Sequence, residues 1–162
     1  MFVKEEGVSL KEQMKRSVFY EMTLERRWDK VFSEENSGNS NELGVDVVVK
    51  TEVAGLGDGR EAVWEEEKVG EEGVMWSRSL ERGERKVGLS MAIVERMRWE
   101  EERGKNNERK QVRFERVEKF EGMWRNFGFY VLVESFVLKR MDGSIVLTCD
   151  FRHSNHVKCT WE

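Results

Sequence analysis

The chain has 162 residues and contains no proline. Average usage of about 5 % would place roughly eight prolines in a chain of this length, so polyproline segments, PxxP ligands and cis-proline turns are excluded. The 28 basic and 32 acidic side chains nearly cancel to a net charge of −4, and this balance disfavours nucleic-acid binding, which needs an excess of Lys and Arg. Six tryptophans, nine phenylalanines and eight methionines supply the core of a single domain over residues 1–162.

The sequence lacks the features of a targeting or membrane-spanning segment. Residues 1–7 contain no continuous apolar stretch of the kind that a signal peptide needs. The longest apolar run, residues 127–138, is interrupted by Glu134 and Ser135 and stays below the ~18 residues of a bilayer span. Two cysteines fit a compartment that keeps thiols reduced. We therefore expect an intracellular protein, cytoplasmic or nuclear, without a membrane span.

The first predicted element is a short helix. Residues 9–12 fit a capping box, in which a serine hydroxyl and a glutamate carboxylate bind free amides at the start of a helix. Leu10, Met14 and Val18 then lie on one apolar stripe of this helix. Residues 17–29 fit either a helix or a strand, because apolar and polar residues begin to alternate at this point.

Polar segments divide the middle of the chain into strands. Residues 33–44 are predicted as a flexible polar loop and residues 100–110 as a charged loop, because both are poor in apolar residues. Between glycine-containing turns, apolar and polar residues alternate with a period of two, which is typical of half-buried strands. The strands predicted in this way are residues 45–53, 61–69, 74–80, 87–99 and 111–120.

The strand over residues 87–99 has a helix as its alternative. Apolar residues occupy nearly every second position from Val87 to Trp99, with only Glu95 out of step. A helix through the same residues would place Glu95 and Arg96 among the buried positions. The period of two therefore favours a long strand.

Two chain reversals are predicted in the last third. Asp142-Gly143 lies between two apolar runs and predicts a two-residue type I′ turn, because glycine tolerates a positive φ. A second reversal is expected at residues 153–155. A three-residue loop there would place Cys149 opposite Cys159 and make one face of the hairpin uniformly apolar.

Together these elements predict a mainly β fold, or α+β once the short N-terminal helix is included. Short connections require antiparallel strands, so we expect an antiparallel meander of about eight strands that forms a barrel or a sandwich. A closed barrel of eight strands can hold one small ligand in its interior. The large side chains that would line such an interior are Trp64, Trp76, Met91, Trp99, Phe136 and Trp161.

Both cysteines and both histidines fall in one short segment: Cys149, His153, His156 and Cys159. Such residues are the usual zinc ligands, but this spacing is not a recognised zinc signature. In the predicted hairpin the histidines lie at the turn, several residues away from the cysteines, and cannot converge on one metal ion. We expect no metal and no cofactor, and zinc is the less favoured alternative.

No segment carries a catalytic motif. The run Glu65–Glu67 fits a solvated surface better than a pair of catalytic carboxylates. Glycines at positions 55, 57 and 59 lack the spacing of a dinucleotide site, and neither a P-loop nor a nucleophile elbow occurs. An enzyme is therefore the least supported class.

Aromatic residues interleaved with arginines are the remaining candidates. In a single-strand nucleic-acid binder such aromatics stack on bases, but Trp76 and Trp99 continue apolar strand faces, which favours a role in the core. Trp124 and Phe127 lie among glycines, so we expect them to be exposed in a loop and able to contact a partner.

The segment from Phe129 to Ser144, with residues 150–153 and the tail from Lys158 to Glu162, resembles a family of small plant-specific proteins without an assigned activity. The resemblance covers the last quarter of the chain and brings no catalytic residue. It implies a plant setting and C-terminal strands that form the centre of the family pattern.

The expected function is a non-catalytic intracellular interaction module that binds a protein partner through surface loops. The alternative is a small barrel that carries an apolar ligand, so the partner is either a protein or a small apolar molecule. The residues expected to contact either one are Trp124, Phe127, Trp64, Trp99 and Phe136.

Overall fold

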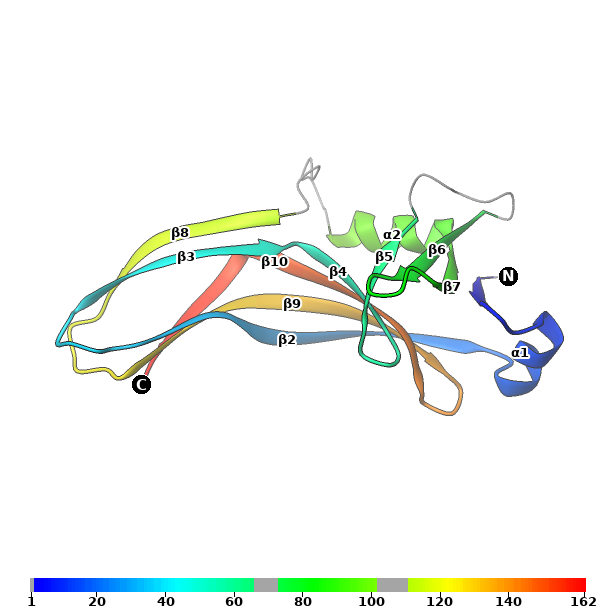
Figure 1. The fold of residues 1–162 in the computed structure, drawn as a ribbon, viewed down its shortest axis with the longest axis horizontal. Helices are drawn as coiled ribbons and strands as arrows, with labels where there is room; N and C mark the ends of the chain where they lie inside the picture. Colours follow the sequence, from blue (N-terminus) through cyan, green and yellow to red (C-terminus); the bar gives the residue numbers. More distant parts are fainter. Residues whose placement is uncertain (1, 66–72, 102–110) are drawn as a thin grey trace. The chain divides into compact units, whose positions relative to one another are not determined.

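The structure is a computed structural model that describes residues 2–65, 73–101 and 111–162. Within these ranges the chain forms ten strands and two helices (Figure 1), which confirms a mainly β fold. Neither described helix is long and apolar enough to cross a membrane. The elements are β1 (Val3–Glu5), α1 (Leu10–Arg16), β2 (Tyr20–Glu35), β3 (Glu42–Lys50), β4 (Glu52–Leu56), β5 (Glu61–Trp64), β6 (Val74–Ser79), β7 (Arg85–Ser90), α2 (Met91–Glu101), β8 (Gln111–Lys119), β9 (Asn126–Arg140) and β10 (Ile145–Trp161).

The chain divides into two compact units, each built from three segments. Unit 1 comprises Met1–Glu25, Val53–Asn107 and Ser135–Asp150, and unit 2 comprises Arg26–Glu52, Glu108–Glu134 and Phe151–Glu162. Strands β2, β9 and β10 contribute residues to both units.

The larger sheet has eight strands in the order β1-β7-β6-β5-β4-β10-β9-β2. Strands β4 to β7 form a meander in which each strand pairs antiparallel with the next. Strands β1 and β2 lie at the two ends of this order. Among the described residues the sheet therefore forms no closed barrel, and no barrel interior is available for a ligand.

Unit 2 is built on a second, two-stranded sheet. Strands β3 and β8 pair antiparallel over their full lengths and run side by side in Figure 1. On the exposed face of this ribbon the Arg113 guanidinium makes two 2.8 Å bonds to the Asp46 carboxylate. The inner face contributes to an apolar core that also takes side chains from β9. The buried members of this core are Leu43, Val45, Val49, Phe114, Trp124, Phe127, Phe129 and Val131.

The prediction of a single strand over residues 87–99 is wrong. Strand β7 stops within this range and helix α2 follows directly. Val94 and Met97 are buried and lie three residues apart, a spacing that places both on one side of a helix. Trp99 is 61 % exposed and carries the Arg96 guanidinium 5.0 Å from its ring centre. A helix accommodates these alternating apolar residues because it buries only some of them and leaves others, such as Trp99, exposed.

The reversal at Asp142-Gly143 is confirmed in position but not in type. The Arg140 N–H donates to the Ser144 carbonyl and the Gly143 N–H donates to the Arg140 carbonyl, both at 2.9 Å. Gly143 has a φ of 89°, whereas no described residue other than glycine has a positive φ. Asp142 therefore cannot occupy a type I′ turn, which needs two positive φ values. The loop has three residues and ends on a glycine.

The second reversal, at residues 153–155, is wrong, because β10 continues through them to Trp161. The strand has neighbours on both sides, β4 and β9, and the Arg152 N–H donates to the Thr51 carbonyl at 2.8 Å. A continuous strand satisfies more backbone groups than a turn would. Cys149 and Cys159 therefore lie far apart along one strand and do not face each other across a hairpin.

The remaining predictions concern the connecting segments. Residues 20–35 are strand, which resolves the ambiguity over 17–29. Of the predicted polar loop over 33–44, only residues 36–41 connect strands. Of the predicted charged loop over 100–110, the first two residues belong to α2 and the rest lie outside the described residues. Strand β5 covers the beginning of the strand predicted at 61–69, most of whose remainder is also outside that range.

Candidate binding surface at helix α1

Helix α1 begins as predicted, and the side that it buries is a polar one next to the apolar stripe. The Ser9 hydroxyl accepts a hydrogen bond from the Glu12 N–H at 3.2 Å, which is the N-cap half of the predicted capping box. The residues that α1 buries are Gln13, 4 % exposed, and the following Ser17, 2 % exposed. The apolar stripe, by contrast, faces solvent: Leu10 is 53 %, Met14 54 % and Val18 72 % exposed.

Gln13 is buried because it completes the edge of strand β1. Its side-chain amide donates to the Val3 carbonyl at 2.9 Å, and its side-chain oxygen accepts from the Glu5 N–H at 3.0 Å. The neighbouring backbone groups of β1 point the other way, toward β7. Gln13 thus provides for β1 the two hydrogen bonds that another strand would otherwise supply.

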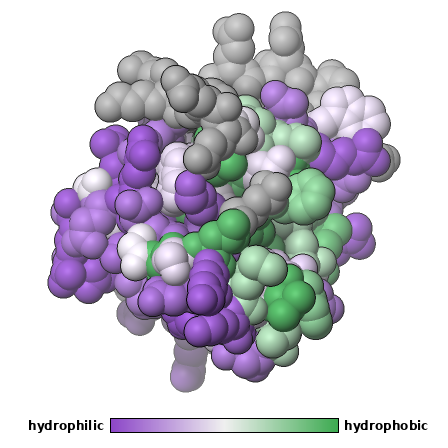
Figure 2. All heavy atoms as spheres, turned by 90° about the vertical axis from the view of Figure 1, so that its right-hand side faces the viewer, coloured by the Kyte–Doolittle hydropathy of each residue, from purple (hydrophilic) through white to green (hydrophobic). Residues whose placement is uncertain are grey.

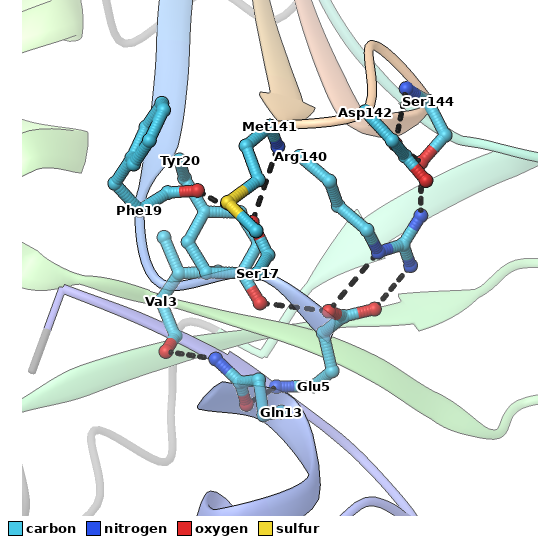
Figure 3. Close-up of polar contacts among 10 residues, drawn as sticks. All are labelled: Val3, Glu5, Gln13, Ser17, Phe19, Tyr20, Arg140, Met141, Asp142 and Ser144. Atoms are coloured by element: carbon cyan, nitrogen blue, oxygen red, sulfur yellow. Dashed lines mark hydrogen bonds and ion pairs between the residues drawn. The ribbon is translucent and has the colours of Figure 1, made fainter. Parts of the chain in front are cut away.

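A charged cluster holds β1 to the end of the β9–β10 hairpin (Figure 3). The Glu5 carboxylate accepts from the Tyr20 hydroxyl at 2.8 Å and from Arg140 Nε at 3.2 Å, and Arg140 Nη2 bonds its other oxygen. Arg140 Nη1 also donates to the Ser144 hydroxyl at 3.0 Å. Glu5 is buried and the Arg140 side chain is largely so, which makes this a shielded, charge-assisted network.

The pKa values in this cluster are shifted away from neutrality. Burial alone would raise the pKa of Glu5, but the hydrogen bonds from Arg140 and Tyr20 outweigh it and lower that pKa. Burial, followed by the hydrogen bond to Glu5, raises the pKa of Tyr20 to about 12. At neutral pH Glu5 is therefore charged and Tyr20 protonated. The cluster is therefore a structural hydrogen-bond network that holds β1 in place, and not a proton donor and acceptor pair. We call it the Glu5–Arg140 cluster.

Ser17 fixes the chain where α1 ends. Its hydroxyl donates to the Phe19 carbonyl at 2.5 Å and accepts from the Met141 N–H at 3.1 Å. The Phe19 and Met141 side chains are both exposed, and Figure 3 shows Ser17 bonded to the backbone of both residues. Figure 2, which views the molecule from the side of α1, shows apolar side chains gathered on one part of this face. We call the exposed apolar set the α1 surface: Leu10, Met14, Val18, Phe19 and Met141.

Two lysines border the α1 surface. Lys11 and Lys15 are exposed and each follows an apolar member of the stripe by one residue. At 3.6 residues per turn this places them beside Leu10 and Met14, on the side away from Gln13. The exposed part of α1 therefore combines an apolar stripe with a basic margin.

The site residues predicted from the sequence lie elsewhere. Trp124 is only 6 % exposed, so the exposure expected of it is wrong: its indole N–H donates to the Ser40 carbonyl at 2.9 Å and its ring meets Trp161 at 5.1 Å. Phe127 is also buried, with its ring 4.6 Å from that of Trp161.

The three other predicted contact residues belong to unit 1 and have different surroundings. Phe136 is buried, Trp64 is half-buried, and Trp99 is exposed on α2. The structure does not bring these residues together with Trp124 and Phe127 into one site, because the latter two belong to the core of unit 2.

The predicted turn at residues 153–155, on which the argument against zinc relied, does not form. Cys149, His153, His156 and Cys159 are spread along β10. The two histidine rings are 5.9 Å apart, and His153 Nε2 lies 3.3 Å from a Glu134 carboxylate oxygen. Burial raises the pKa of the Cys159 thiol, which disfavours the thiolate that metals bind. In the part of the chain that the structure describes, no three His, Cys, Asp or Glu residues gather in a way that could hold a metal ion.

We also compared the sequence with known proteins. The sequence matches no family model, and no curated protein matches it.

Proposed function

We propose that the protein is a non-catalytic interaction module and that it binds a protein partner through the α1 surface. The observation that carries this proposal is the orientation of α1, which buries Gln13 and Ser17 and exposes Leu10 and Met14. Exposed apolar side chains gathered on one face are typical of interaction sites. This supports a contact at α1 in preference to the loop around Trp124.

The α1 surface is rigidly supported. Gln13 binds β1 twice, Ser17 bonds the backbone at Met141, and Glu5 bonds both Tyr20 and Arg140. A surface that is held in place before binding loses less conformational entropy when the partner arrives. The buried polar contacts thus fix the position of apolar groups that have no role in the core.

The basic margin indicates the chemistry of the partner. Lys11 and Lys15 are exposed beside the apolar stripe, so carboxylates on a partner would gain attraction there, while further lysines would be repelled. We propose a partner segment that combines large apolar side chains with neighbouring Asp or Glu. The alternative, a carrier of an apolar ligand, needs an enclosed interior, which an open sheet does not supply.

The test is selection of peptides from a random library against the purified protein, followed by fluorescence anisotropy with labelled winners. We expect enriched peptides to pair apolar with acidic residues. The double variant Leu10→Ser/Met14→Ser should bind them at least about 30-fold more weakly, since each truncated contact at the centre of an interface costs over ~1 kcal/mol. Lys11→Glu/Lys15→Glu reverses the charge of the basic margin. It should weaken peptide binding and reduce the dependence of the affinity on salt concentration.

The matched control is Leu80→Ser, which removes an exposed leucine elsewhere in unit 1 and should leave peptide affinity unchanged. Circular dichroism of each variant checks that the fold is intact. The proposal fails if no peptide is enriched, or if the selected peptides bind Leu10→Ser/Met14→Ser as tightly as the original protein.

A further inference from the structure

A second feature of interest is a cavity of about 290 Å³ in unit 2. It lies at the ends of strands β2, β9 and β10, and all of its lining belongs to unit 2. Its volume is close to the lower end of small-molecule sites, about 300 Å³. The residues that line it are Lys30, Ser33, Glu34, Glu35, Asn126, Phe127, Gly128, Tyr130, Thr160 and Glu162.

The cavity depends on a glycine inside a strand. A Cβ atom at Gly128 would come within 2.8 Å of both the Thr160 hydroxyl and the Tyr130 ring, closer than such atoms can approach. Glycine in a strand interior weakens the strand, and it often marks a place where another group comes close to the backbone. Gly128 therefore lets the Thr160 hydroxyl and the Tyr130 ring, which both line the cavity, lie close against the strand backbone.

Polar groups around the cavity are available to a ligand. Within the described chain, the hydroxyls of Ser33 and Thr160 and the side-chain amide of Asn126 form no hydrogen bond with the protein. Each of these groups can both donate and accept. They surround the same cavity from three different strands, so one small molecule could bind all of them at once.

The charged groups at the cavity restrict the class of ligand. Lys30 Nζ lies 5.7 Å from the centre of the Tyr130 ring, and Lys158 Nζ lies 5.4 Å from the same centre. Three glutamates, Glu34, Glu35 and Glu162, also line the cavity. Their carboxylates repel a polyanion, and the polar lining offers little to an apolar molecule. The two lysines already lie against Tyr130, the position that an organic cation would seek.

We propose that this cavity binds a neutral polyhydroxylated molecule, a sugar of about one ring. Hydroxyl groups can donate to carboxylates, accept from Lys30, and do both with Ser33, Asn126 and Thr160. This site is separate from the α1 surface, and binding there does not depend on the proposed protein partner.

The test is a titration of the ¹⁵N-labelled protein followed by NMR. The probes are glucose, galactose, mannose, N-acetylglucosamine and myo-inositol, with spermidine as the cationic and citrate as the anionic comparator. We expect at least one of the neutral probes to cause saturable shifts at the Gly128 and Thr160 amides and at the Asn126 side chain below about 50 mM. The proposal is overturned if every neutral probe fails to saturate at this concentration, or if spermidine or citrate binds more tightly there.

Two variants and one control make the result specific. Gly128→Ala should abolish the shifts, because the added Cβ atom would displace the Thr160 hydroxyl and the Tyr130 ring that line the cavity. Thr160→Val removes a hydroxyl with little change of shape and should weaken binding about 3- to 10-fold, the effect of one neutral hydrogen bond. The control is Gly44→Ala in β3, where an added Cβ meets no atom within 4 Å, and it should bind as the original protein does. Shifts that survive both Gly128→Ala and Thr160→Val would contradict the proposal.

Discussion

The core of unit 2 and the α1 surface of unit 1 place their side chains in opposite ways. In the core of unit 2 aromatic residues are enclosed: Phe129 is 0 % exposed and its ring meets that of Phe114 at 5.2 Å. At α1 the polar Gln13 is enclosed, and the aromatic Phe19 just beyond the helix is 60 % exposed. The two regions therefore differ in which kind of side chain the neighbouring backbone requires.

The difference follows from what each element packs against. Strands β3 and β8 satisfy each other's backbone groups, so their inner face needs only apolar contact. Helix α1 lies beside β1, whose carbonyl at Val3 and N–H at Glu5 have no strand partner and are bound by Gln13 instead. A buried backbone group without a hydrogen bond is more costly than an exposed leucine. The orientation of α1 thus follows from the hydrogen bonds that the backbone of β1 needs from Gln13.

The largest expected effect is in the unit 2 core. Phe129→Ala should lower the free energy of unfolding by about 3–5 kcal/mol, because it removes a fully buried ring and leaves a cavity. Phe19→Ala, the same substitution at an exposed position, should change it by less than about 0.5 kcal/mol. Urea unfolding followed by circular dichroism measures both. Equal losses for the two variants would mean that Phe19 is buried in solution and would remove the contrast between the regions.

The second largest effect on the free energy of unfolding is expected at the Glu5–Arg140 cluster. Arg140→Met leaves the buried Glu5 carboxylate without its main partner and should cost about 3 kcal/mol in unfolding free energy. The double variant Glu5→Gln/Arg140→Met, which removes both charges, should recover part of this loss. A single variant as stable as the original protein would show that the Glu5–Arg140 pair does not hold β1.

The Glu5–Arg140 cluster should also make the stability of the protein depend on pH in the acid range. Because the pKa of Glu5 is lowered on folding, its contribution is present above about pH 4.3, the ordinary pKa of glutamate, and is lost as pH falls through the lowered value. In Arg140→Met this acid-side decline should be weaker.

Strand β8 and the start of helix α1 were predictable because they depend on local pattern. The ribbon strand β8 follows residue alternation, and Ser9 caps α1 as its position indicates. The segment 87–99 and the reversal at 153–155 failed because tertiary neighbours decided them. Residues 91–101 pack as a helix, and β10 continues because β4 and β9 flank it.

The candidate site was harder to predict than the fold. The apolar stripe of α1 is visible in the sequence, but the stripe alone does not say which side of a helix is buried. The signal that could have indicated it is Gln13 and Ser17, four residues apart and on one side of the helix. Their burial depends on bonds to β1 and to Met141, residues that only the folded chain brings near.

A smaller effect is expected at alkaline pH. The folded protein raises the pKa of Tyr20 from 10.0 to about 12, so the folded state holds this proton more tightly than the unfolded one. The contribution of Tyr20 to the free energy of unfolding is therefore fully present below pH 10 and is lost between about pH 10 and 12. The loss should be about 1 kcal/mol once solvent screening is allowed for. Tyr20→Phe should lack this decline. Tyrosinate absorbance of the two proteins, compared by difference, should place the Tyr20 midpoint near 12.

The smallest effect on stability should come from the α1 surface itself, and its smallness is informative. Leu10→Ser replaces a leucine that is largely exposed, so it should change the free energy of unfolding by less than about 0.5 kcal/mol. The same variant should bind less of a dye that fluoresces on exposed apolar surface, whereas Leu80→Ser reports the background for a leucine elsewhere in unit 1. A loss above about 2 kcal/mol, the value for a buried leucine, would mean that Leu10 packs inside the protein. A leucine that stabilises nothing in its own chain but attracts an apolar probe is available for the contact with a partner that we propose.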